Sequence, residues 1–565
     1  MSVPPVTNSN VARISVGIYR LQEDPEVSLA CKEAKESGYD FITLPIARPG
    51  YRRFLFEQPK DASGSRAMEE WRKRYVFSAQ DLVLKNADFV DYAVGKISDW
   101  LDLDSSDHDI RTNSEIALKQ QISWAGHLGL SAVLAPFPAD CPMNYARSLN
   151  SILDVLTYTH VWMKIPLTLE NSGAQDTVTW EKWNTFRTLC EHPTKLVIAL
   201  EVTAQLPEDK ILDRWFAEPI RAVILPTSIF LTNVKGYPVL SRRHQVFVRR
   251  FIKYKTNFMI FDDMRSQDAK GGLSAYQEYV RHLNRTMPDP TQIERFSTGY
   301  HDFLQSPLQP LMDNLESSTY EVFEKDAVKY ALYEKVFVHR RFTDRMHLTV
   351  LYPCFNLSLQ NMKANVWGDR VTIAFSDMRR WKAPEKADIL VSELLGSFGD
   401  NELSPECLDG AQKFLKPGGI SIPASYTTFI SPLSSTKLHN EVAAYKDLTH
   451  FETPYVVMFQ SVSELAEPQE VWKFVHPNKS IEVDDDEMPI NNFHNTRYSK
   501  RIFEVKESGL LHGIAGYFES VLYKDILMSI LPATHSDDMF NTNLSAIRCE
   551  IGNSFLEIDK SHESM

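Results

Sequence analysis

Eight short apolar runs in the first half of the chain constrain its fold most strongly. Each is rich in β-branched residues, as expected of a parallel strand buried on both faces, and helical segments such as residues 25–36 separate them. Eight βα units are the number that closes a (β/α)8 barrel, so we predict a TIM barrel. The runs are residues 14–19, 40–46, 92–97, 131–137, 161–167, 195–202, 221–230 and 257–263.

Three of these runs carry a charged residue near their carboxyl end, namely Lys96, Glu201 and Asp262. The carboxyl ends of barrel strands form the catalytic face of such enzymes, so an active site here is one interpretation. No metal-ligand set and no phosphate-binding glycine loop accompanies them in the sequence. We therefore favour a barrel that serves as a scaffold or docking surface.

The composition is that of a globular protein with two or three domains, at 565 residues, 43% hydrophobic and 24% charged. The net charge of −13 disfavours direct nucleic-acid binding and suits basic protein partners. No signal sequence and no long apolar stretch is evident, so we expect no membrane association and a cytoplasmic and nuclear location. Six cysteines without a CxxC pair argue against a zinc site and a disulfide framework.

The second half of the chain changes character after a polar, proline-bearing connector at residues 284–307. A helical pattern at 310–335 and strand candidates at 370–375 and 387–391 predict a second α/β unit. Beyond Pro423 an antiparallel β domain is indicated, and the acidic segment 481–500 is predicted to be an exposed loop. The strand candidates of that domain are residues 426–430, 455–459, 471–474, 501–505 and 517–530.

Two glutamates, Glu393 and Glu402, flank a loop directly after the strand candidate 387–391. Ligands of open α/β sheets bind at the carboxyl ends of the strands, and Gly396 and Gly399 would let the loop double back, so both carboxylates could reach one pocket. The alternative is an ordinary solvent-exposed loop, in which Glu393 caps a neighbouring element and Glu402 faces water. A pocket of this kind could serve as a glycosidase acid pair, a divalent-metal site, or a clamp for a guanidinium group in an alkylation.

The loop sequence SELLGSFGDNELSPECLDG resembles the double-glutamate loop of the symmetric (type II) protein arginine methyltransferases. The resemblance extends over most of the chain, through ILPTSIFLTN, LQSPLQPLMDNLESSTYEVFEKD, SDMRRWKAPEKADILVSELLGS and GIAGYFESVLYKDI. It implies a TIM barrel at residues 10–283, a Rossmann-like methyltransferase domain at 289–422, and a C-terminal β-barrel and oligomerisation domain at 425–565.

The same resemblance implies methyl transfer from S-adenosyl-L-methionine to arginine side chains, ending in symmetric dimethylarginine. Glu393 and Glu402 would clamp the substrate guanidinium, and Phe323 would direct the second methyl group to the other nitrogen. The residues expected at the cofactor are Tyr320, Lys329, Tyr330, Asp377 and Met378.

The implied partners are proteins. Arginine-rich tails of histones and splicing proteins would be the substrates, a WD-repeat propeller would dock on the TIM barrel, and the chain would form a homo-oligomer.

The sequence departs from the family at the cofactor turn. A Rossmann-type domain needs glycines after its first strand and an acidic residue near the end of the next, yet no glycine stands between Tyr320 and Gly368. We therefore expect residues 335–362 to have lost a central strand and its turn, as exon skipping or a mispredicted gene would cause. A new cofactor loop around Pro353 is less favoured, because proline offers no N–H.

A second departure lies at the C-terminus, where the resemblance fades near residues 539–540. The family continues with a strand whose tryptophan stacks on the substrate arginine, whereas no tryptophan follows Trp472 here. We expect an incomplete β-barrel with exposed edges. The alternative function is therefore an inactive scaffold that keeps partner binding through its TIM barrel.

Overall fold

The computed structural model describes residues 13–49, 51, 78–169, 177–263, 269–290, 295, 298–307, 327–340, 348–351, 372, 374, 378, 381–485, 487–535 and 545–548. The chain divides into two compact units, Met1–Asp289 and Pro290–Met565. Within the described residues, no helix is both long enough and apolar enough to span a membrane.

The first unit is a closed barrel of parallel strands in the order β1-β10-β7-β6-β5-β4-β3-β2. Each apolar run predicted as a strand corresponds to one of them, which confirms the TIM barrel. The run 221–230 is shorter as a strand than predicted, because η1 (Thr227–Ile229) follows β7 directly. The strands are β1 (Val16–Arg20), β2 (Phe41–Pro45), β3 (Ala93–Lys96), β4 (Ala132–Ala135), β5 (His160–Pro166), β6 (Leu196–Glu201), β7 (Ile220–Pro226) and β10 (Asn257–Asp262).

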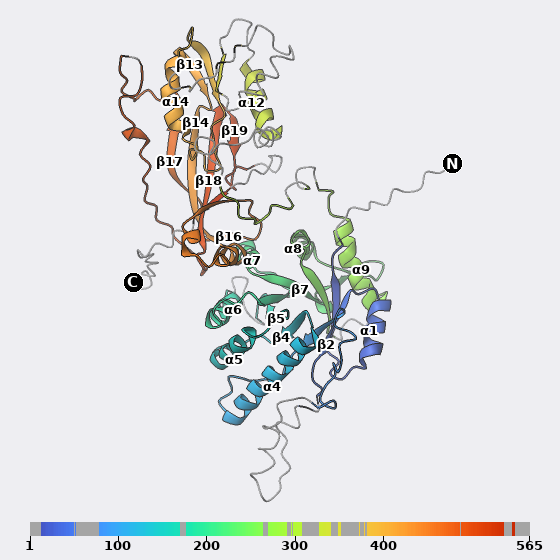
Figure 1. Cartoon of the computed structure of the whole chain (residues 1–565). Coiled ribbons are helices and arrows are strands. Elements are labelled where there is room, and N and C mark those ends of the chain that lie inside the picture. The colour runs from blue at the N-terminus through green and yellow to red at the C-terminus, as the bar shows by residue number, and fades with distance from the viewer. Residues whose placement is uncertain are drawn as a thin grey trace, which may run out of the picture. The chain divides into compact units, whose positions relative to one another are not determined.

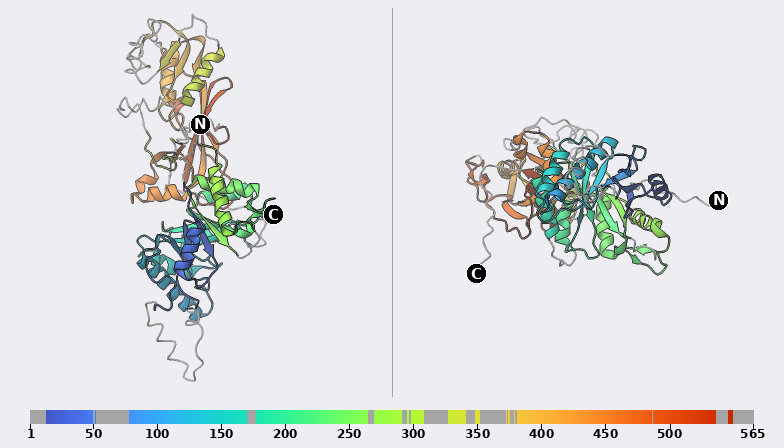
Figure 2. Two further views of the ribbon diagram at one scale, coloured as in Figure 1. Left: turned by 90° about the vertical axis from the view of Figure 1, so that its right-hand side faces the viewer. Right: turned by 90° about the horizontal axis from the view of Figure 1, so that it is seen from below.

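The barrel strands are apolar on both faces because each face meets a different core. Tyr19, Trp162 and Met259 belong to one buried cluster, formed by strand residues that fill the barrel. Neighbouring residues such as Ile18 and Val161 pack instead with the surrounding helices. Figures 1 and 2 show these helices on the outside of the strands. They are α1 (Val27–Glu36), α4 (His108–Leu128), α5 (Met143–Leu153), α6 (Val178–Leu189), α7 (Asp209–Phe216), α8 (Arg242–Lys253) and α9 (Gly272–Arg285).

Helix α4 illustrates how local sequence sets the helix ends. The Asp107 carboxylate accepts the backbone N–H groups of Asp109 and Ile110 at 2.8 and 3.1 Å, which caps the first turn. Gly129 ends the helix with φ of +82°, a conformation that glycine adopts without steric cost. A small hairpin of β8 (Leu231–Thr232) and β9 (Pro238–Val239) lies between β7 and α8.

The α/β part of the second unit contains a parallel sheet in the order β11-β12-β13. Strand β12 (Ala387–Ser392) matches the predicted strand 387–391 and lies between β11 (Leu348–Leu351) and β13 (Leu415–Ile422). The apolar run of β11 supplies a strand beside β12. The expected loss of a central strand and its turn from residues 335–362 stays a prediction, because much of that segment lies outside the described residues. Helix α12 (Ala327–Arg340) precedes β11, and α14 (Ser404–Ala411) with η4 (Gln412–Phe414) leads into β13.

The rest of the second unit is an antiparallel sheet, as predicted, in the order β15-β20-β18-β14-β16. Strand β17 pairs with β14, and β19 pairs with β18. The long strands β14 and β18 form its centre and are visible in Figure 1. The strands are β14 (Ser425–Ser434), β15 (Pro454–Val457), β16 (Ser463–Glu464), β17 (Gln469–Val475), β18 (Gly513–Tyr523), β19 (Ile526–Ser529) and β20 (Ser545–Arg548), and α15 (Thr436–Ala443) follows β14.

One strand prediction for this sheet is wrong, because residues 501–505 form no strand although their alternating pattern resembles one. Strand β20, from the C-terminal segment that departs from the family, pairs with both β15 and β18. Over the described residues the sheet is open and ends at β15 and β16, and the expected incomplete β-barrel stays a prediction. Most of the strand candidate 370–375 and most of the helical segment 310–335 lie outside the described residues.

Candidate active site

Lys96 and Glu201, near the carboxyl ends of their barrel strands, each form an ion pair. Lys96 Nζ lies 2.5 Å from Asp99 Oδ2, and Lys164 Nζ lies 3.1 Å from Glu201 Oε1. Both lysines also lie over the Tyr19 ring, at 5.2 and 5.7 Å from its centre. These contacts give Lys96 and Glu201 structural partners, and the preference for a scaffold or docking barrel stays a prediction.

The double-glutamate loop begins where β12 ends and runs into α14. Gly396 and Gly399 exchange backbone hydrogen bonds of 3.1 and 3.0 Å, so the chain doubles back between the two glutamates as predicted. Gly399 has φ of +82°, and a Cβ added there would lie 3.2 Å from Phe518 Cβ. A glycine is therefore needed at this turn, both for its backbone conformation and for space.

Glu393 and Glu402 interact electrostatically across this loop. Glu402 is partly buried, and burial followed by the negative charge of Glu393 raises its pKa from 4.5 to about 7, while Lys329 opposes the shift. A carboxyl group in this state ionises readily when a cation arrives, and it can also hold a proton near neutral pH. The charge of Glu393 therefore influences whether Glu402 is ionised.

Lys329, on helix α12, forms an ion pair with Glu393. Its Nζ lies 2.5 Å from Glu393 Oε1 and 5.2 Å from the centre of the Tyr330 ring. The Tyr333 hydroxyl donates to the Ser392 carbonyl at 2.8 Å, and Tyr333 belongs to a buried cluster with residues of β12, β13 and β18. These contacts fix the helix at the end of β12, and so place Lys329 beside Glu393.

Of the remaining predicted site residues, the structure describes only Met378, and it does not lie with this cluster. Met378 packs against the buried cluster that contains Leu390, whereas Ile389 and Val391 on the other face of β12 belong to the cluster that α12 joins. Met378 and Lys329 therefore lie on opposite faces of the strand, because successive side chains of a strand alternate. The other three, Tyr320, Phe323 and Asp377, lie outside the described residues.

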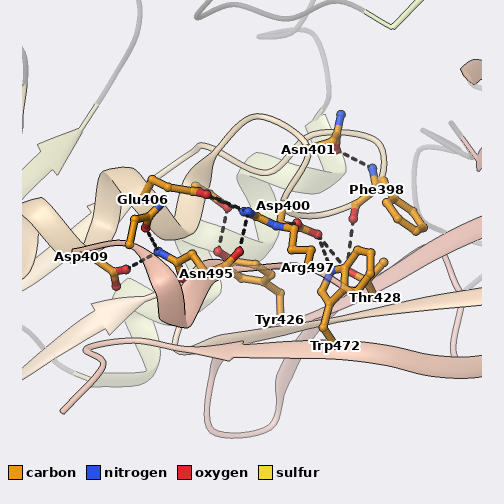
Figure 3. A network of polar contacts seen from close by, with 12 residues as sticks. Phe398, Asp400, Asn401, Glu406, Asp409, Tyr426, Thr428, Trp472, Asn495 and Arg497 are labelled. Atoms are coloured by element: carbon orange, nitrogen blue, oxygen red, sulfur yellow. Dashed lines mark hydrogen bonds and ion pairs between the residues drawn. The ribbon is translucent and has the colours of Figure 1, made fainter. Parts of the chain in front are cut away.

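Sequence reasoning missed a polar network around Asp400, which stands between the two glutamates (Figure 3). Asp400 is 3% exposed and its carboxylate accepts hydrogen bonds from Thr428 Oγ1 at 3.1 Å and Trp472 Nε1 at 2.8 Å. It also pairs with Arg497 Nε. The only local signal was that Asp400 lies between Glu393 and Glu402, since its partners come from distant segments.

Arg497 belongs to the segment 481–500, which was predicted to be exposed. Much of that segment is exposed, but Asn495 is buried and donates to Asp409 Oδ2 at 2.7 Å. The prediction is therefore wrong for Asn495 and for the partly buried Arg497, whose side chains bond to residues of α14. An acidic composition indicates solvation on average and does not reveal such individual contacts.

The first residue of α14 is anchored by a second set of polar contacts. Ser404 Oγ donates to the Tyr426 hydroxyl at 2.8 Å, and His476 Nε2 lies 3.1 Å from the same hydroxyl. Burial lowers the pKa of His476 to about 4, so this imidazole is neutral at pH 7. The contacts tie the end of the loop to strand β14.

Three family models match successive parts of the chain. The PRMT5 TIM barrel domain matches residues 38–286, the PRMT5 arginine-N-methyltransferase matches 291–348 and 353–422, and the PRMT5 oligomerisation domain matches 425–542.

Curated relatives match over nearly the whole length. Protein arginine N-methyltransferase 5 of Oryza sativa subsp. japonica is 43% identical over 591 residues, covering 91% of this chain and 87% of its own. The Xenopus laevis protein of the same name is 40% identical, covering 89% of this chain and 86% of its own. Protein arginine N-methyltransferase skb1 of Schizosaccharomyces pombe is 34% identical, with 92% and 88% covered.

Proposed function

Because this chain belongs to the PRMT5 family of arginine N-methyltransferases, we propose that it methylates protein arginines with S-adenosyl-L-methionine and yields symmetric dimethylarginine. The observation that carries the proposal is the pair Glu393 and Glu402 on the loop after β12, where burial and then the charge of Glu393 raise the pKa of Glu402. Arginine-rich tails, as on histones and splicing proteins, are the proposed substrates.

The carboxylate pair suits a guanidinium group better than it suits either alternative ligand. Arginine is permanently charged and carries five N–H donors in a planar fork, which two carboxylates can accept together. Its arrival lowers the pKa of Glu402, so both carboxylates are then ionised. Among the described residues, no group of three or more His, Cys, Asp or Glu side chains is placed to hold a metal ion.

The described residues fit the amino-acid end of the methyl donor. Lys329 lies beside the carboxyl end of β12, where open α/β sheets bind their ligands, and its ammonium group can pair with a ligand carboxylate. Tyr330 is the neighbouring aromatic surface. When bound, S-adenosyl-L-methionine supplies an electrophilic methyl group. Contacts to its adenine would fall to Asp377 and Met378 by family resemblance.

The protein's own contribution is to orient the arginine and to take up a proton. Glu393, held by Lys329, fixes one side of the guanidinium, while Glu402 binds the other side and can accept the proton that a nitrogen releases on methylation. Phe323 is proposed, from the resemblance, to direct the second methyl group to the other terminal nitrogen.

A second candidate function is a scaffold that does not transfer methyl groups. Strand β11 ends at Leu351 and is followed by Tyr352 and Pro353, where a Rossmann-type turn needs glycine. The alignment with the rice relative is longer than this whole chain, so that relative carries residues inside the aligned range that this chain lacks. A scaffold of this kind would use its TIM barrel to dock a WD-repeat propeller and its C-terminal domain to form a homo-oligomer.

Titration calorimetry of the full chain with S-adenosylhomocysteine tests the proposal. Micromolar binding, followed by mass-spectrometric detection of symmetric dimethylarginine on an arginine–glycine peptide, is the result expected of the transferase. The variant Glu402→Gln serves as the control, because it should bind S-adenosylhomocysteine without methylating the peptide. A folded chain that shows no binding would refute the transferase and leave the scaffold.

A further inference from the structure

A single guanidinium group spans the stretch of backbone that carries Glu402 (Figure 3). Arg497 Nε pairs with Asp400, two residues before Glu402. Its two terminal nitrogens donate to Glu406 Oε1 and Oε2 at 2.7 and 3.0 Å, four residues after Glu402. A forked, charge-assisted contact of this kind restricts orientation as well as distance.

The backbone that Arg497 spans is strained. Leu403, directly after Glu402, has φ of +61° and ψ of +33°, the left-handed conformation that a branched side chain rarely adopts. Leu403 is 46% exposed, so burial of its own side chain does little to support this conformation. Strain persists only where surrounding contacts impose it, and here the Arg497 pairs on either side act together with the anchoring of Ser404 to Tyr426.

Arg497 is itself held in place by its neighbours in sequence. His494 Nε2 and Asn495 Nδ2 each lie 2.7 Å from Asp409 Oδ2 on helix α14. The Asn495 carbonyl accepts a further bond from Arg497 at 3.0 Å, and the guanidinium lies over the Phe474 ring. These contacts fix the segment around Arg497 against helix α14 and the glutamate loop.

We propose that Arg497 is a positioning residue, which holds Glu402 where it can accept a guanidinium group. The proposal rests on the proposed function, because it assumes that Glu402 is a ligand of the substrate arginine. Arg497 itself contacts Asp400 and Glu406 and acts through the backbone between them. Trp472 Nε1 donates a hydrogen bond to the carboxylate of Asp400 and should therefore also help to position Glu402, with a smaller effect than Arg497.

The test measures binding of a glycine-rich peptide with one arginine to the full-length chain by fluorescence anisotropy. A citrulline peptide, which lacks the positive charge, gives the baseline. Arg497→Ala should weaken arginine-peptide binding about tenfold, the effect of losing one well-placed charged hydrogen bond at Glu402. Trp472→Phe, which keeps an aromatic side chain and removes the indole N–H donor, should weaken it by a smaller factor and covers the case in which Arg497→Ala fails to fold.

Arg501→Ala is the matched control. Arg501 lies in the segment just after Arg497 but bonds to the backbone carbonyls of Glu470 and Val471, away from the glutamate loop. Its removal should leave peptide binding within about twofold of the unmodified chain.

A double-mutant cycle separates positioning from general stability. In a Glu402→Gln background, Arg497→Ala should have no further effect on the arginine peptide, because the group that it positions is gone. Equal losses in both backgrounds, or unchanged binding in Arg497→Ala and Trp472→Phe, would overturn the inference. If the unmodified chain fails to prefer arginine over citrulline, the proposed function itself fails, and the positioning role fails with it.

Discussion

Replacing Glu402 by glutamine should stabilise the second unit at alkaline pH while it removes arginine binding. The pKa of Glu402 is raised from 4.5 to about 7, chiefly by burial and then by Glu393. Each pKa unit corresponds to about 1.36 kcal/mol, so the ionised carboxylate costs the folded state about 3 kcal/mol. Glutamine has the same shape and no charge, and therefore avoids this cost.

The sign of the effect follows from proton binding. Because the folded state has the higher pKa, it binds more protons than the unfolded state between pH 4.5 and about 7. The contribution of Glu402 to stability is therefore fully present below pH 4.5 and is lost as the pH rises through about 7. The variant should equal the unmodified chain at low pH and exceed it by about 3 kcal/mol near pH 8.

Urea-dependent hydrogen exchange, read by mass spectrometry on peptides from β12, measures this difference within the second unit. The comparison at about pH 5 and about pH 8 isolates the ionisation of Glu402. Glu452→Gln, at an exposed position of the same unit, is the control and should show no such pH dependence. If Glu402→Gln has the same stability as the unmodified chain at both pH values, the assignment of Glu402 as a partly buried carboxylate with a raised pKa is refuted.

Three further substitutions test individual structural contacts in the two units. Glu218→Gln should destabilise the barrel by about 3 kcal/mol in urea denaturation, because it leaves the buried Arg187 without its charged partner. Gly399→Ala should weaken arginine-peptide binding in an anisotropy titration, because φ of +82° and the nearby Phe518 force the loop to shift. Asp302→Asn should cost about 1 to 3 kcal/mol and expose residues 298–307 to limited proteolysis, because Asp302 Oδ1 accepts two successive backbone N–H groups at 2.7 and 3.0 Å.

The barrel and the glutamate loop could be predicted because their signals are local. A buried parallel strand shows in sequence as a short apolar run, and eight such runs in succession match the closed barrel. The spacing of Gly396 and Gly399 between the two glutamates indicated a loop that doubles back, and the backbone bonds between these glycines confirm it. Residues 501–505 show the limit of the same method, since an alternating pattern there does not form a strand.

Two strands form in segments where the resemblance to the family breaks. Strand β11 lies beside β12, and β20 pairs between β15 and β18. Every residue except proline carries both a backbone donor and a backbone acceptor, so a segment can enter a sheet without the side chains that its relatives use. A departure in side chains at one segment therefore need not remove the strand formed there.

The sequence by itself determined the barrel, the strand before Glu393 and the presence of two carboxylates at one loop. Only the tertiary structure decided that Lys329 pairs with Glu393, that the pKa of Glu402 is raised, and that Arg497 spans the loop from nearly a hundred residues away. Secondary structure follows from patterns within a few residues, whereas burial and charge pairing depend on which distant segments the strands and helices bring together.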